Sequence, residues 1–91
     1  MAVIKATSRI NNKLGLHARA SAKLSKLAGS FRSDVFLARQ GRRVNAKSIM
    51  GVMMLAAGIG SDVEIETDGV DEAQAMAALV AIFEDKFGEG Q

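Results

Sequence analysis

Apolar and polar residues alternate along two stretches of the chain, which is typical of β-strands with one buried face. The clearer stretch is DVEIETDG, in which Val63, Ile65 and Thr67 alternate with acidic residues. The weaker one runs from Val3 to Ile10 and ends at an Asn-Asn pair. Each pattern predicts a strand with one face against a core and the other in water, as in an antiparallel sheet covered on one side.

A third strand signal contains a turn. Residues Ser33 to Arg39 and Arg42 to Asn45 flank the dipeptide Gln40-Gly41. Glycine adopts positive φ without steric cost, so the dipeptide predicts a tight hairpin between two short strands.

Helical spacing follows the first strand, from Arg19 to Ala28. Apolar residues recur at Ala20, Leu24, Leu27 and Phe31, and basic residues at Arg19, Lys23 and Lys26 lie on a neighbouring face. We therefore expect a helix with one buried face and one basic stripe, ended by Gly29 and Ser30.

Two more helices are predicted. The apolar segment SIMGVMMLA, Ser48 to Ala56, predicts a short helix with Ser48 as its candidate N-cap. Its methionines either fill gaps in the core or remain exposed as a binding surface, and the pattern leaves both interpretations open. The last helix begins at Asp71, with Gln74 completing a variant capping box. Its core-facing residues are Met76, Leu79, Val80, Phe83 and Phe87.

The order strand, helix, strand, strand, helix, strand, helix predicts an α+β protein of two layers, with the helices on one face of a sheet. A chain of 91 residues has room for one core, so we expect a single domain over residues 1–91. No apolar run approaches the ~18 residues of a membrane span, and no signal peptide is evident. With no cysteine in the chain, these features favour a cytoplasmic protein without a membrane partner.

Charge is distributed unevenly along the chain. Residues 1–47 contain eleven of the twelve basic residues and one acid, whereas residues 48–91 contain nine acids and one base. A basic surface built from the first half would attract an acidic protein, a phosphorylated group or nucleic acid.

The single histidine, His17, is the main candidate for chemistry. A lone histidine is most often a packing or surface residue. His17, however, lies at a predicted helix N-terminus, where unpaired N–H groups favour anions and the neutral, nucleophilic imidazole. Arg19 could contact the same phosphate oxygens. A phosphoryl acceptor is therefore chemically reasonable.

Other chemistries fit less well. A zinc site needs three or four ligands, which one histidine and no cysteine do not supply. No nucleophile-elbow motif accompanies His17, and the glycine-containing loop Gly58 to Ser61 is better explained as a turn. Ser48 has two interpretations, as a simple helix cap or as a hydroxyl whose phosphorylation would place about two negative charges beside an apolar patch.

Three segments of the chain are similar to a known family. They are GLHAR (15–19), NAKSIMGVMML (45–55) and VEIETDGVDEAQAMAAL (63–79). Together they resemble the HPr family, the phosphocarriers of the bacterial phosphoenolpyruvate-dependent sugar phosphotransferase system. The resemblance extends over essentially the whole chain.

This resemblance implies an HPr-like open-faced sandwich, βαββαβα, with a four-stranded antiparallel sheet of order 1-4-2-3 and three helices on one face. It implies that His17 accepts a phosphoryl group on Nδ1 (the pros nitrogen) from phosphorylated enzyme I and passes it to enzyme IIA. Arg19 would stabilise the phosphate. The protein would then be a carrier rather than a turnover enzyme, a monomer without metal or cofactor.

The resemblance also assigns partner contacts and a regulatory site. Ser48 matches the serine that HPr kinase/phosphorylase modifies, and Lys26, Ile49, Met50 and Met53 match contacts to enzyme I. One position departs from the family, which usually has proline where this chain has Ala20. We expect the helix to form with a slightly less rigid start, by less than ~1 kcal/mol.

Two alternatives remain open at this point. The same phosphoryl chemistry could serve regulation, as in a nitrogen-type or incomplete phosphotransferase system, instead of sugar uptake. A small nucleic-acid-binding domain could instead use Arg39, Arg42, Arg43 and Lys47, although the chain has no tryptophan or tyrosine for base stacking. We therefore expect no nucleic-acid partner.

Overall fold

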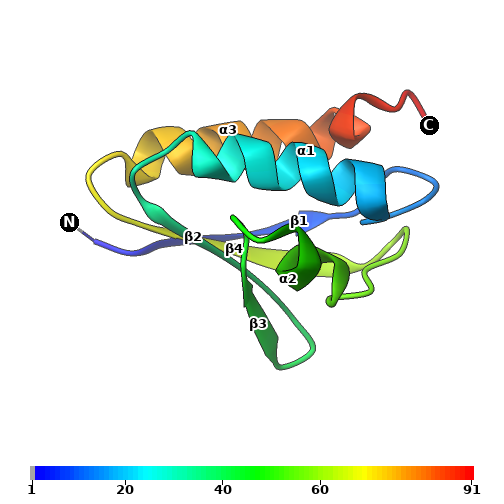
Figure 1. Ribbon diagram of the computed structural model, residues 1–91, viewed down its shortest axis with the longest axis horizontal. Helices are drawn as coiled ribbons and strands as arrows, with labels where there is room; N and C mark the ends of the chain where they lie inside the picture. The colour runs from blue at the N-terminus through cyan, green and yellow to red at the C-terminus, as the bar shows by residue number, and fades with distance from the viewer. Residues whose placement is uncertain (1) are drawn as a thin grey trace.

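The computed structural model describes residues 2–91, so Met1 of the expected domain lies outside the described residues. The elements along the chain are β1 (Ile4–Arg9), α1 (Ala18–Gly29), β2 (Asp34–Arg39), β3 (Arg42–Asn45), α2 (Ile49–Met53), β4 (Asp62–Asp68), α3 (Glu72–Glu84) and the 3₁₀ turn η1 (Lys86–Gly88). Figure 1 shows α1 and α3 lying side by side across the sheet, with α2 beside α1 near β3. This order confirms the predicted sequence of strands and helices.

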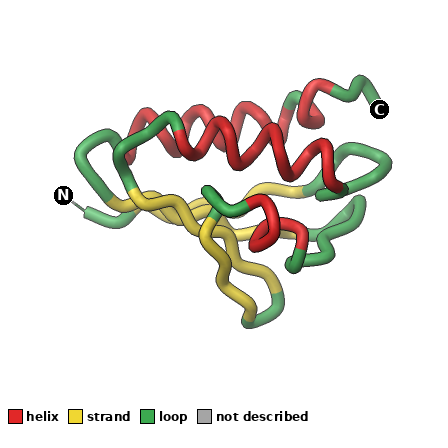
Figure 2. The backbone as a smooth tube through the Cα atoms, in the orientation of Figure 1, coloured by secondary structure: helices red, strands yellow, loops and turns green. Residues whose placement is uncertain are grey.

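The four strands form one antiparallel sheet of order β1-β4-β2-β3. Strand β4 lies between β1 and β2, and its Ile65 pairs with Ala6 of β1 and with Leu37 of β2. Figure 2 shows the sheet as a layer below the two long helices, α1 and α3. The expected α+β open-faced sandwich is therefore confirmed.

The core fills the space between the sheet and helices α1 and α3. The alternation in β4 has the predicted consequence, since Val63, Ile65 and Thr67 are fully buried while Asp62 and Glu64 are exposed. Burying such aliphatic side chains stabilises a fold by roughly 1.5–3 kcal/mol each. The other fully buried large apolar residues are Ile10, Leu24, Val35, Leu37, Val52, Leu79, Phe83 and Phe87, the last two at 1% exposure.

The hairpin between β2 and β3 turns where the sequence predicts. Gln40 has φ 50° and Gly41 has φ 82°, and the strands pair from Arg39 opposite Arg42 onward. Positive φ at both central residues is the geometry that matches the right-handed twist of the flanking strands.

Helix α2 is shorter than predicted. The expected helix extends from Ser48 to Ala56, but the helix spans only Ile49–Met53 and the chain reaches φ 51° at Ala56. This ending turns both Leu55 and Ala57 toward the core, where each is 3% exposed. Two residues at i and i+2 lie on the same side of an extended chain but on different sides of a helix, so a longer helix could not bury both side chains in this way. Tertiary burial therefore overrides the helical signal here.

The methionines of this region are exposed. Met50 is 69% exposed, Met53 39% and Met54 57%. Because these side chains fill no gap in the core, the interpretation of this segment as an exposed apolar surface is the correct one for all three.

The predicted capping box at Asp71 is wrong. Asp71 occupies the N-cap position of α3 but makes no side-chain cap. Its carboxylate instead accepts hydrogen bonds from the Ser33 hydroxyl (2.5 Å), the Ser33 N–H (2.8 Å) and the Arg32 N–H (3.0 Å). These bonds, the Ser33 hydroxyl first, lower the pKa of Asp71 to about 2. A long-range tie between two loops therefore replaces the local cap.

Candidate phosphoryl-acceptor site

His17 lies immediately before helix α1, at the N-cap position, with extended backbone at φ −71° and ψ 178°. Its side chain makes no capping hydrogen bond. The first N–H groups of a helix have no partner within the helix, so this end of α1 presents unpaired donors and the positive end of the helix dipole. The structure thus places His17 at a helix start, as the sequence predicts.

Gly15 fixes the backbone that leads into this helix. It is buried with φ 64°, and a Cβ on it would lie 2.4 Å from the carbonyl oxygen of Ala57. The same oxygen accepts a 2.9 Å hydrogen bond from the N–H of Leu16. Glycine is therefore required here both for the positive φ and for the close approach of the two backbones.

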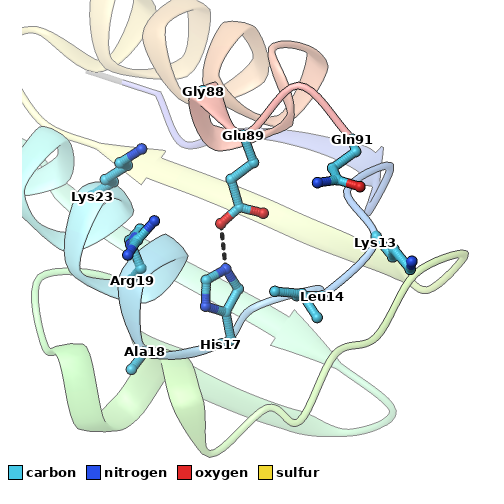
Figure 3. Close-up of a pocket in the computed structure, with 9 residues that line it drawn as sticks. All are labelled: Lys13, Leu14, His17, Ala18, Arg19, Lys23, Gly88, Glu89 and Gln91. Atoms are coloured by element: carbon cyan, nitrogen blue, oxygen red, sulfur yellow. Dashed lines mark hydrogen bonds and ion pairs between the residues drawn. The ribbon is translucent and has the colours of Figure 1, made fainter.

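The His17 ring lies in a surface pocket of about 700 Å³ between the start of α1 and the C-terminal residues (Figure 3). Its side chain is 28% exposed. The lining residues are Lys13, Leu14, His17, Ala18, Arg19, Lys23, Gly88, Glu89 and Gln91. Three basic side chains and one acidic side chain line this pocket, so its side chains give it a net positive character suited to an anion.

Arg19 projects into the same pocket from the first turn of α1 and is exposed. The neighbouring cation, Lys23, donates a 2.9 Å hydrogen bond from Nζ to the carbonyl oxygen of Phe87. Lys23 thus ties α1 to the C-terminal turn, while Arg19 is exposed in the pocket that holds the His17 ring.

A carboxylate from the C-terminal segment contacts the His17 ring. One oxygen of Glu89, Oε2, pairs with His17 Nε2, and the other, Oε1, accepts a 2.8 Å hydrogen bond from Asn12 Nδ2. Hydrogen bonding by Asn12, and secondarily by His17, lowers the pKa of Glu89 from its usual value. The carboxyl group is therefore ionised near neutral pH and accepts on both oxygens.

The sequence patterns did not indicate Glu89 or Asn12 as site residues. Glu89 lies 72 positions from His17, and no local spacing links them. In the sequence, Asn12 belongs to a predicted turn. Its complete burial in the structure distinguishes it from an ordinary turn asparagine. Phe87 is buried and packs on Phe83, with ring centroids 5.1 Å apart. This contact anchors the C-terminal segment beside the site.

Ala20 lies in the first turn of α1 and is fully buried. The helix begins two residues earlier, at Ala18, so it forms as expected without a proline at this position.

The four residues expected to contact partners are exposed, but they do not all lie in one patch. Ile49 is 46% exposed and lies with the exposed Met50 and Met53 on α2, directly after Ser48. Lys26 is also exposed, yet it lines a separate groove on the α3 side of α1 together with Ile82. The structure thus brings the α2 residues into one patch and leaves Lys26 on a different side of α1.

Ser48 is the N-cap of α2. Its Oγ accepts a 3.1 Å hydrogen bond from the N–H of Gly51, and the residue is exposed. The predicted cap is confirmed, and the exposed hydroxyl lies at the edge of the apolar patch.

The basic residues considered for nucleic acid are engaged within the chain. Arg39 and Arg42 donate to the carbonyl oxygens of Leu55 and Met54, and Lys47 to that of Phe31. The guanidinium of Arg43 bonds Glu66 at 2.8 Å and lies 3.7 Å from the Phe36 ring centroid. These four cations hold loops and strands together, which weakens the case for an open phosphate-binding surface.

Among residues 2–91, no cluster of three or more histidine, cysteine, aspartate or glutamate side chains could hold a metal ion. In that same part of the chain no helix is long and apolar enough to cross a membrane.

The structure thus defines a small open-faced α+β sandwich with one histidine at an uncapped helix start, in a pocket suited to an anion. Comparison with known proteins identifies the class of protein. The family model described as the PTS HPr component phosphorylation site matches residues 4–85. This chain belongs to the HPr family, the phosphocarrier proteins of the phosphotransferase system.

Individual relatives agree with this assignment. The phosphocarrier protein HPr of Cupriavidus necator is 63% identical over 89 residues, covering 98% of this chain and all of that protein. The crystal structure of an HPr from Thermoanaerobacter tengcongensis superposes with a TM-score of 0.91 at 43% identity, covering 94% of this chain and 97% of that one. A crystal structure of an HPr dimer from the same organism has a TM-score of 0.77 at 44% identity, with coverage of 92% and 97%.

Proposed function

We propose that this chain accepts a phosphoryl group on Nδ1 of His17 from phosphorylated enzyme I, and passes it to an enzyme IIA. The phosphoryl group derives from phosphoenolpyruvate. The observation that supports this proposal most directly is the position of the His17 ring, at the uncapped start of α1 in a pocket lined by Lys13, Arg19 and Lys23.

The site suits a group that has to arrive and leave again. The unpaired N–H groups of the first helical turn and the guanidinium of Arg19 both favour phosphate oxygens. Arg19 is exposed, so its hydrogen bonds to a phosphoryl group remain in competition with water. A modest hold of this kind stabilises the phosphorylated ring without trapping it, and it needs no metal or cofactor.

The exposed patch of Ile49, Met50 and Met53 is the proposed docking surface for enzyme I. Flexible thioether side chains adapt to more than one partner, which a carrier needs because it meets a donor and several acceptors. Lys26 extends the proposed contact area across α1 and contributes charge steering toward an acidic partner.

Ser48 is the proposed site of regulatory phosphorylation, where HPr kinase/phosphorylase is present in the cell. A phosphate on its Oγ would stay at the start of α2 and add about two negative charges beside Ile49 and Met50. Such a charge would weaken an apolar contact with enzyme I by desolvation and repulsion.

The proposal includes a monomeric, cytoplasmic protein with one domain over residues 1–91. A relative of known structure is described as a dimer, so the proposed monomer is a testable property of this chain. Light scattering during size-exclusion chromatography at micromolar concentration measures it, and a mass of one chain is the expected result.

Phosphoryl transfer from labelled phosphoenolpyruvate in the presence of enzyme I tests the main proposal. We expect one phosphate per chain that is labile in acid and stable in base, as for phosphohistidine. His17→Ala should abolish the labelling, because His17 is the only histidine in the chain. Labelling that persists in this variant would place the phosphate on another residue and contradict the proposal.

Arg19→Ala should slow the transfer without abolishing it. We expect a loss of about tenfold, less than the roughly 10²–10³ lost with a buried oxyanion-hole donor, because Arg19 is exposed. Arg32→Ala is the matched control, since Arg32 is also exposed but follows the other end of α1. An equal loss in both variants would show a general effect of charge instead of contact with the phosphate.

A further inference from the structure

The carboxylate of Glu89 is the only acidic side chain that lines the His17 pocket within residues 2–91. It lies among Lys13, Arg19 and Lys23, and its side chain is only 12% exposed. A carboxylate in this position would repel a phosphate that bound in the pocket, so its presence beside the reacting ring calls for a specific reason.

Several contacts act together to hold Glu89 beside the His17 ring. Asn12, which is completely buried, donates from Nδ2 both to Glu89 Oε1 and to the carbonyl oxygen of Gly15, each at 2.8 Å. The chain reaches this position through a sharp turn in which Lys86 and Phe87 both have φ 55°. Left-handed conformations at two successive residues that are not glycine persist only where surrounding contacts compensate for the strain.

The hydrogens in this network can be assigned from the acceptors. The carbonyl oxygen of Gly15 only accepts, so the amide of Asn12 must present Nδ2 to it and to Glu89. The ionised carboxylate of Glu89 also only accepts, so the hydrogen in its bond to His17 must belong to Nε2. A neutral imidazole with hydrogen on Nε2 carries its lone pair on Nδ1.

We infer that Glu89 is a positioning residue for phosphoryl transfer, which selects the tautomer of His17 with hydrogen on Nε2 and thereby leaves Nδ1 as the nucleophile. This inference rests on the proposed function, because it concerns the same ring. Glu89 acts through His17 and does not contact the reacting phosphorus.

The inferred step balances without any proton transfer. The lone pair of Nδ1 forms a bond to phosphorus, and the bond from phosphorus to its donor atom breaks with its electron pair remaining on the donor. Nε2 keeps its hydrogen, so the His17 ring becomes positively charged as the new bond forms. The Glu89 carboxylate, hydrogen-bonded to Nε2, stabilises that charge, as a buried carboxylate does for the histidine of a catalytic triad.

Glu89→Gln separates this role from simple packing. The oxygen of the new amide must face the NH₂ of Asn12, so its own NH₂ faces His17 Nε2 and favours hydrogen on Nδ1. The ¹⁵N chemical shifts of the ring, measured on the unphosphorylated protein at a pH where imidazole is neutral, report the tautomer directly. We expect the wild type to carry hydrogen on Nε2 and Glu89→Gln to shift the population toward hydrogen on Nδ1.

The rate of labelling by enzyme I and phosphoenolpyruvate should fall by at least about tenfold in Glu89→Gln, because the reacting nitrogen is then protonated. Glu89→Ala should give mixed tautomers and a smaller loss. The matched control is Glu84→Gln, which makes the same charge change at an exposed position outside the pocket. Circular dichroism and thermal unfolding verify that each variant is folded.

Each outcome decides the inference. Wild-type ring shifts in Glu89→Gln would overturn it, and so would an unchanged or faster rate of labelling, which would indicate a shielding role for Glu89. The tautomer measurement needs no phosphoryl donor. A wild-type protein that enzyme I does not label would therefore refute the proposed function, while the ring shifts would still test the role of Glu89.

Discussion

Helix α1 begins at His17 without a side-chain cap, whereas helix α2 begins at Ser48 and is capped by the serine hydroxyl. At α1 no side chain of residues 2–91 caps the N-terminus from the N-cap position, and the His17 ring turns away to Glu89. At α2 the hydroxyl satisfies the N–H of Gly51 at 3.1 Å. One helix start is thus open to a bound anion, and the other is satisfied by its own first residue.

This difference separates the two proposed phosphorylation sites. The surroundings of His17 include two segments that are distant in sequence, namely Glu89 and the backbone at Ala57, and the nearby Asn12 that bonds Glu89. The hydrogen bond to the Ser48 hydroxyl comes from its own helix, from the N–H of Gly51. A change in the distant segments should therefore affect the α1 start, and only a change at Ser48 itself should affect the α2 start.

Gly15→Ala should break the α1 start and have the largest effect on stability. The new Cβ would lie 2.4 Å from the Ala57 oxygen and 2.8 Å from the Gly58 Cα, so the loop must move and the Leu16 hydrogen bond is lost. Together with the positive φ, we expect a loss of about 2–4 kcal/mol in the free energy of unfolding, measured by urea denaturation.

Gly41→Ala is the control for this prediction. Gly41 also has positive φ, at 82°, but a Cβ there would meet nothing within 4 Å. Only the backbone strain should remain, at about 1–2 kcal/mol. If the two substitutions cost the same, the close approach at Gly15 contributes nothing and our account of the α1 start is wrong.

Substitutions at Ser48 test the α2 start, with a smaller effect. Ser48→Ala removes the cap and should cost about 1 kcal/mol in unfolding free energy, while Ser48→Asn and Ser48→Asp keep an acceptor and should cost little. Transfer from enzyme I should separate the last two, because only aspartate adds charge beside Ile49 and Met50.

We therefore expect Ser48→Asp to be phosphorylated on His17 more slowly than Ser48→Asn, with Ser48→Asn close to wild type. Similar slowing in both would mean that the shape of the side chain, and not its charge, affects the docking of enzyme I. Equal rates in all variants would leave Ser48 with the role of a cap alone.

Features with a local cause could be predicted from the sequence. The alternation in β4, the hairpin turn at Gln40-Gly41, and the start of α1 at His17 all follow from residues within a few positions. The extent of α2 could not be predicted, because an unbroken apolar run carries no periodicity that marks its end. Its end depends on how Leu55 and Ala57 fit a core built by other segments.

The residues of the candidate site divide in the same way between local and long-range causes. His17 and Arg19 follow from the chain near them, whereas Glu89 enters only through the tertiary fold, and the exposure of the α2 methionines was left open by the sequence pattern. The same limit explains the error at Asp71, since an aspartate before a helix with a polar residue three positions on resembles a capping box until Ser33 is placed beside it.

Helix α3 offers a third kind of start, and its test gives the smallest effect because it is confined to acid. The pKa of Asp71 is lowered to about 2 from 3.8, chiefly by the hydrogen bond from the Ser33 hydroxyl. A carboxyl group whose folded pKa is depressed stabilises the fold fully above its unfolded pKa. That stabilisation is lost as pH falls through the folded value.

We expect wild type to be more stable than Asp71→Asn at neutral pH, because an amide cannot accept all three bonds from Ser33 and Arg32 on its single oxygen. The difference in urea midpoint between the two proteins should shrink from about pH 4 toward pH 2, where Asp71 becomes protonated. Glu84→Gln, which removes an exposed carboxylate from the other end of α3, controls for general charge effects. A difference that stays constant over this pH range would show that the charge of Asp71 does not link the two loops, and that the start of α3 is stabilised by its backbone contacts alone.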